Sequence, residues 1–212
     1  MKLPLARRMV YVSARVTFAV LALYMVLRGD YEAAFIAATG FVVSIFPQLV
    51  VQKLKLHLPV SYEIVVMGFI VASIMLGELF DIYEKYWWWD SVLHLSSGVI
   101  IGYIGFMILY VFRLQGKLTV GPGIIAFLVF SVSMMVASMW EVFEFAVDQV
   151  TGSRMQRHNF DTMKDIILAM LGSILASFVA YWHTRWPESS PLRRQLTKFA
   201  RKNAHLITGR SR

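Results

Sequence analysis

Six long stretches of apolar residues follow one another along the chain, separated by short polar connections. They cover residues 9–27, 31–51, 61–80, 90–112, 124–147 and 161–182. Each approaches the ~20 residues that an α-helix needs to cross a hydrocarbon core about 30 Å thick. The apolar residues are continuous and do not alternate with polar ones, which predicts membrane-spanning helices and not membrane-spanning strands. The expected fold class is therefore all-α, a polytopic bundle of six transmembrane helices.

The two ends of the chain need separate treatment. No small-x-small cleavage site follows Leu27, so the first apolar stretch is expected to remain in the protein as an uncleaved span. The six-span domain then occupies residues 1–184, and residues 185–212 form a basic tail. Apolar residues in this tail recur at helical spacing, which predicts a short amphipathic helix on an anionic membrane surface. They are Leu192, Leu196, Phe199 and Leu206.

The composition agrees with an integral membrane protein. Hydrophobic residues make up 58% of the chain and charged residues 16%, with a mean hydropathy of +0.59. The chain has no cysteine, which excludes disulfides, thiolate metal sites and a cysteine nucleophile. The net charge of +8 could suggest nucleic-acid binding. The distribution of the basic residues along the chain instead indicates that they set the orientation of the protein in the membrane.

The basic residues are sorted by side of the membrane. With six spans, both termini share one side, and that side receives 16 of the 21 Lys and Arg residues but only two acids, Glu63 and Glu188. The opposite side has five basic residues and 11 of the 13 acids. By the positive-inside rule the termini are expected in the cytoplasm and the acidic side outside. Membrane lipids are then the expected partners, and no nucleic acid is.

Several acids lie at the expected outer ends of the spans. Asp90 and His94 are spaced i, i+4 and share a helix face, and so do Asp161 and Asp165. Glu141 lies about six residues inside the end of its span. A carboxylate near hydrocarbon is costly unless it is paired, hydrated or holding an ion. Three helices could therefore direct polar side chains into one outward-open pocket.

Each of these residues also has a purely structural interpretation. Asp90 and Asp161 stand where helices begin and could cap them. Glu144 could be solvated at the rim, and Asp148 could be an ordinary interfacial acid. A lone histidine near the end of a span is more often a structural hydrogen-bonding group than a catalytic one. Glu141 and Asp165 are harder to explain in this way, because each lies at least one turn inside its span.

Taken together, one histidine and several carboxylates suit a divalent metal ion such as Zn²⁺, Mn²⁺, Fe²⁺ or Mg²⁺. The expected metal ligands are His94, Glu141 and Asp165, and Asp90 joins them in the expected catalytic group. A second group of polar residues at the same face is expected to bind substrate. Its members are Glu78, Glu144, Arg157 and Asp161.

Four short motifs carry a resemblance to a known family. They are Gly77-Glu78-Leu-Phe-Asp81-Ile-Tyr83, Trp89-Asp90-x-x-x-His94-x-x-x-Gly98, Trp140-Glu141-x-x-Glu144, and Asp161-Thr162-x-x-Asp165 followed by Gly172. With them the chain resembles the YjdF-like family of bacterial membrane-spanning proteins, and more distantly VanZ-like proteins, which are linked to glycopeptide resistance. The resemblance covers roughly residues 77–172. It implies a multi-pass protein of the bacterial inner (plasma) membrane, within the cell envelope.

Three functions from different classes fit these features. The first is a metal-assisted hydrolase or transferase acting at the outer leaflet on lipid head groups or isoprenoid-linked phosphates, with Arg157 steering the phosphate. The second is a small transporter or ion-coupled carrier, although the acids gather at one face and no inverted repeat is evident. The third is a non-catalytic subunit that binds lipid or a protein partner. No G-x-S-x-G nucleophile motif is present.

Overall fold

The computed structural model describes residues 5–53, 55–152, 155, 156 and 158–205. These residues form helices and connections, with no strand among them. Six helices in the described part of the chain are long and apolar enough to cross a membrane, which confirms the six-span prediction. They cover Arg8–Leu27, Tyr31–Lys53, Val60–Leu79, Trp89–Leu114, Pro122–Val150 and Asn159–Arg185. The chain divides into two compact units, residues 1–89 and 90–212, and each is described by itself.

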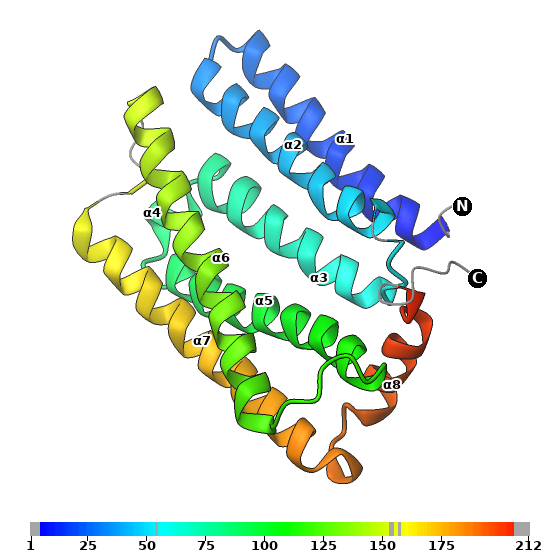
Figure 1. Cartoon of the computed structure of the whole chain (residues 1–212). Coiled ribbons are helices and arrows are strands. Elements are labelled where there is room, and N and C mark those ends of the chain that lie inside the picture. The colour runs from blue at the N-terminus through cyan, green and yellow to red at the C-terminus, as the bar shows by residue number, and fades with distance from the viewer. Residues whose placement is uncertain (1–4, 54, 153–154, 157, 206–212) are drawn as a thin grey trace. The chain divides into compact units, whose positions relative to one another are not determined.

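The first unit begins with a helical hairpin. Helices α1 (Leu5–Leu27) and α2 (Tyr31–Lys53) are joined by a tight turn in which Gly29 has a φ of +76°, and they run antiparallel side by side (Figure 1). Pro47 lies inside α2, which nevertheless continues to Lys53. The ring of Phe18 lies directly over Gly40, where an added Cβ would stand 2.6 Å from Phe18 Cδ1. Gly40 thus allows the two helices of the hairpin to approach closely.

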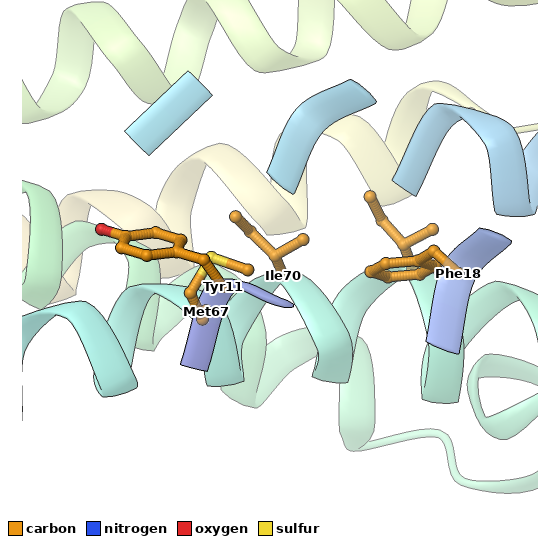
Figure 2. Packing of buried hydrophobic residues seen from close by; sticks show 5 residues of the cluster. Tyr11, Phe18, Met67 and Ile70 are labelled. Atoms are coloured by element: carbon orange, nitrogen blue, oxygen red, sulfur yellow. The ribbon is translucent and has the colours of Figure 1, made fainter. Parts of the chain in front are cut away.

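The core of this unit forms between α1 and the third span. Tyr11 and Phe18 of α1 pack with Met67 and Ile70 of α3 (Val60–Ile70), and all four side chains are buried (Figure 2). Arg15, the one charged residue inside the first span, donates a hydrogen bond from Nη2 to the Ser44 carbonyl oxygen at 3.1 Å. The Arg15 guanidinium therefore has a hydrogen-bond acceptor within the chain itself, besides any contact with lipid head groups.

The third span is not a uniform α-helix. It continues from α3 as a π-helix, η1 (Val71–Leu79), and a short helix α4 (Ile82–Lys85) follows. Between them Asp81 adopts a left-handed φ of +54°. The Tyr83 ring folds back onto Gly77, which has no room for a side chain. The conspicuous motif of residues 77–83 therefore contains, in this structure, the turn between η1 and α4.

The second unit is built on three long helices and a short terminal one. These are α5 (Trp89–Leu114), α6 (Pro122–Thr151), α7 (Asn159–Arg185) and α8 (Arg193–Lys202), with the 3₁₀ turn η2 (Pro187–Ser189) before α8 (Figure 1). Proline at the first position of α6 suits a helix start, and left-handed Gly152 ends it. His158 caps the start of α7, and its Nδ1 accepts a hydrogen bond from Asp161 N at 3.0 Å.

Helices α5 and α7 touch at backbone level. A Cβ on Gly98 of α5 would collide with the Ala169 carbonyl oxygen, and one on Gly172 of α7 would collide with the Leu95 carbonyl oxygen. Small residues of this kind are what allow helices to pack closely in a bilayer. Helix α6 joins the contact through Ser133, whose hydroxyl donates to the Gly98 carbonyl oxygen at 2.9 Å and lies 2.7 Å from Ser173 Oγ. The three helices are thereby fixed against one another.

The amphipathic helix expected in the tail is present as α8, although Leu206 lies outside the described residues. Leu196 and Phe199 are buried within the protein, so the face that α8 offers to its surroundings is the basic one. His183, near the end of α7, lies with Nδ1 2.7 Å from Ser190 Oγ just before α8. That the helix rests on an anionic lipid surface stays a prediction.

Candidate metal centre

A polar cluster lies near one end of α5, α6 and α7. His94 stands twenty residues before the end of α5, Glu141 nineteen after the start of α6, and Asp165 twenty before the end of α7. At 1.5 Å per residue, each is about 28–30 Å from the opposite end of its helix. That distance is about the thickness of the hydrocarbon core. Three helices thus bring these side chains to the same level, near one end of each helix.

The His94 ring is at the centre of the cluster. Its Nε2 is 3.3 Å from Asp90 Oδ1, one turn back on α5, and 3.9 Å from Asp165 Oδ2 on α7. Its Nδ1 is 3.8 Å from Glu141 Oε1 on α6. Carboxylates from three helices therefore surround one imidazole, two of them on its Nε2 side and one on its Nδ1 side.

Lys164 provides a cation at the rim of the cluster. Its Nζ is 2.7 Å from Asp161 Oδ1, 3.0 Å from Asp90 Oδ2 and 3.4 Å from Asp165 Oδ1. The first turns of α7 supply both the lysine and two of the acids, because residues 161, 164 and 165 share one face of the helix. Lys164 thereby links α7 to Asp90 on α5.

Two of the carboxylates are deeply buried. Glu141 and Asp165 are each 5% exposed. Glu141 Oε2 is buried and has no hydrogen-bond partner among the described residues. Burying a carboxylate in this way is costly unless a cation or hydrogen bonds compensate it. Four acids around His94 and Lys164 leave an excess of negative charge, which a further cation would offset.

The geometry of three of these residues suits a metal ion. One ligand atom each from Asp90, His94 and Asp165 all lie within 4.8 Å of one another. Tetrahedral ligands at ~2.1 Å from an ion stand about 3.4 Å apart. The separations from His94 Nε2, 3.3 and 3.9 Å, are close to this value. An imidazole with two carboxylates would accept Zn²⁺, Mn²⁺ or Fe²⁺ readily and Mg²⁺ less so.

Glu141 lies beside His94, as expected, but on the other side of the ring from the two aspartates. Its carboxylate faces Nδ1, whereas both aspartates face Nε2. Its role as a metal ligand stays a prediction. A metal-bound histidine commonly donates its other N–H to a carboxylate, which fixes the ring. Asp90, His94 and Asp165 are the three residues whose ligand atoms are grouped closely enough to hold a metal ion.

The four residues expected to bind substrate do not all lie at the cluster. Glu144 accepts a hydrogen bond from the Trp140 indole at 2.7 Å, one turn along α6 from Glu141. Asp161 does not cap α7, because His158 does so. The Asp161 carboxylate forms an ion pair with Lys164 instead. Glu78 belongs to the first unit, at the end of η1. Arg157 lies outside the described residues, so the substrate-binding roles of both stay predictions.

Two residues near the site were not anticipated from the sequence. Lys164 is one of the five basic residues on the acidic side, and its position between Asp161 and Asp165 is a signal of pairing. Gln156 donates from its side chain to the Glu141 carbonyl oxygen at 3.0 Å, and its backbone N–H donates to Asp148 at 2.8 Å. Asp148 also accepts from Met155 N at 2.8 Å. Asp148 therefore binds Met155 and Gln156, which follow the end of α6.

Comparison with known proteins adds a family. Residues 9–186 match the family described as "Predicted membrane protein (DUF2238)". The chain is also 25% identical over 126 residues to a Thermotoga maritima protein named "Uncharacterized protein". That match covers 59% of this chain and 64% of the relative, so the chain spans less than two thirds of the relative's length.

No solved structure matches the chain. The family match agrees loosely with the YjdF-like resemblance, whereas the VanZ-like resemblance is not supported. The family match includes all six spans and every residue of the polar cluster. The protein is a multi-pass membrane protein and belongs to the DUF2238 family.

Proposed function

We propose that this protein binds a divalent metal ion between Asp90, His94 and Asp165 and uses it to hydrolyse or transfer a lipid head group or an isoprenoid-linked phosphate. The observation that carries the proposal is the convergence of these three ligand atoms within 4.8 Å of one another. Asp165 is almost fully buried, and His94 and Asp90 have side chains only 14% and 15% exposed. Such a shielded set favours a bound ion over freely hydrated side chains.

The chemistry follows from the residues around the ion. A divalent ion at this point would polarise a phosphoryl oxygen and provide a bound water as nucleophile. Asp90 and Asp165 would hold it through one oxygen each, and His94 through Nε2. Glu141 would accept the Nδ1 proton of His94 and so fix the tautomer and the orientation of the ring. Glu144 lies one turn further toward the end of α6.

The depth of the site supports a lipid substrate. The cluster lies about one hydrocarbon thickness from the opposite ends of its helices, which is the level of head groups and not of acyl chains. The excess of Lys and Arg on the opposite side favours an orientation in which this boundary is the outer one. A phosphorylated lipid would meet the site without leaving the bilayer.

The packing below the site favours an enzyme over a carrier. Directly beneath the cluster, the α5 and α7 backbones touch at Gly98 and Gly172, and the Ser133 hydroxyl binds both helices. A carrier that moved an ion from the cluster between these three helices would have to separate this contact. Their close contact leaves little room for a path of this kind.

The test is metal binding by protein purified in mild detergent and stripped with chelator. Calorimetry with Zn²⁺, Mn²⁺, Fe²⁺ and Mg²⁺ should give one ion per chain for at least one metal, and Asp165→Asn and His94→Gln should each abolish binding. Glu188→Gln is the matched control, because Glu188 pairs with Arg193 on the surface, away from the cluster. Release of phosphate from phosphorylated lipids in vesicles should then follow metal occupancy. The absence of stoichiometric binding by the unaltered chain would refute the proposal.

A further inference from the structure

The carboxylates of Asp90 and Asp165 each face two different cationic positions. Toward His94 Nε2 they present Asp90 Oδ1 and Asp165 Oδ2. Toward Lys164 Nζ they present their other oxygens, Asp90 Oδ2 and Asp165 Oδ1. The same two side chains therefore bridge the position where the metal would bind and the position where the ammonium lies.

The ammonium position has the character of a cation site. Three carboxylates, from Asp90, Asp161 and Asp165, converge on Nζ at 2.7–3.4 Å. Asp161 contacts only this position and is not among the three residues grouped around His94. In two-metal sites, bridging carboxylates hold ions about 3.5–4 Å apart. Here the arrangement of the bridging groups is similar, but one of the two cations is a lysine of the chain.

We propose that Lys164 fills a second cation position, so that the loaded centre is a pair of one divalent ion and one ammonium bridged by Asp90 and Asp165. The inference rests on the proposed function, since it takes the first position to hold a metal. The three carboxylates that face these two positions carry three negative charges, and a divalent ion with one ammonium supplies three positive ones. Glu141, on the Nδ1 side of His94, adds one further negative charge. Lys164 is thus a specificity-determining residue that restricts the centre to a single metal ion.

The Lys164 ammonium also affects how strongly the centre would bind a phosphorylated substrate. A second divalent ion in place of the ammonium would add one positive charge to the centre and would hold phosphate more strongly. With Lys164 in the second position the centre carries one positive charge less, so a phosphorylated head group bound at the metal is released more easily. Because the lysine is covalently part of α7, it cannot be lost to chelators or exchanged for another ion.

The experiment measures how many Mn²⁺ ions each variant binds. The unaltered chain and Lys164→Arg should bind one ion, and Lys164→Gln should bind two. The two ions should give a spin-coupled electron paramagnetic resonance spectrum, because bridged ions lie close together. Asp161→Asn in the Lys164→Gln background removes a ligand of the second position only, and should return the count to one. Asp161→Asn alone should leave one ion bound.

The outcomes separate the two proposals. One ion in both the unaltered chain and Lys164→Gln would overturn the lysine's role and leave the metal site standing. No ion in the unaltered chain would overturn the metal site, and the paired centre with it. If Lys164→Gln does not fold, Lys164→Met keeps the aliphatic stem and is expected to bind two ions. If neither folds, a second, spin-coupled ion in the unaltered chain at millimolar Mn²⁺ would overturn the inference, and its absence would support it.

Discussion

Replacing Gly98 by alanine tests whether the close contact of α5 and α7 positions the metal ligands. The new Cβ would collide with the Ala169 carbonyl oxygen and would stand 2.9 Å from Ser173 N. Ordinary contacts between a methyl carbon and such atoms are about 3.5 Å or longer. The two backbones must therefore separate by about 1 Å or more. Neither obstacle is the flexible end of a side chain that could move aside.

The expected cost has two parts. Overpacking of a tight interface destabilises a protein by about 1–3 kcal/mol. The separation also moves α7 away from His94, which is one turn from Gly98 on α5. The gap between Nε2 and Asp165 Oδ2, already 3.9 Å, would then exceed the spacing that one ion can bridge at ~2.1 Å from each ligand. We expect metal affinity to fall at least tenfold.

Gly105→Ala is the matched control on the same helix. Its Cβ would stand 3.4 Å from Val132 Cγ1, which is an acceptable contact. Both variants add one methyl group to α5 and raise its helix propensity equally. Thermal unfolding and metal calorimetry in detergent compare them directly. Equal stability and equal metal affinity in the two variants would refute the view that the glycine contact positions the site.

Three further predictions concern single features. Glu141→Gln should keep one metal ion per chain but weaken its binding by about 10–100-fold, as loss of a group that orients a ligand does; calorimetry checks this, and complete loss of binding would make Glu141 a direct ligand. A reporter active only in the cytoplasm should work after Arg212 and be silent when inserted near Gly152, and activity at both places would contradict the outward site. Lys198→Gln with Arg201→Gln on the exposed face of α8 should weaken vesicle binding by about 1 kcal/mol per residue in anionic membranes, with thermal stability unchanged; unchanged binding would show that α8 does not touch lipid.

The six spans could be predicted from the sequence because continuous apolar runs of this length have one stable form in a bilayer. The boundaries agree within a few residues, as the fifth span begins at Pro122 and the sixth continues to Arg185. The change from α to π geometry at Val71 could not be predicted in this way. It alters the hydrogen-bonding pattern without changing the hydropathy of the segment, and the Tyr83 ring on Gly77 accompanies it.

The residues of the site could be chosen from the sequence, but their arrangement could not. The spacing of Asp90 and His94 places both on one face of a helix, and their depth follows from the spans. Which ring nitrogen faces Glu141 depends on how α6 is rotated against α5, and the Ser133 hydroxyl on the Gly98 carbonyl helps to set that rotation. Helical spacing alone contains no information on such a contact between helices. The same reason explains why the link from Lys164 to Asp90 was missed.

The central claim is that His94 and two aspartates bind one metal ion, and pulsed electron paramagnetic resonance of the Mn²⁺-loaded protein tests it most directly. Imidazole nitrogen bound to Mn²⁺ gives a nitrogen coupling that water and carboxylate ligands do not. The site described here predicts this coupling from a single histidine in the unaltered chain, and its loss in His94→Gln. Tightly bound Mn²⁺ without nitrogen coupling, or with a coupling that persists in His94→Gln, would contradict it.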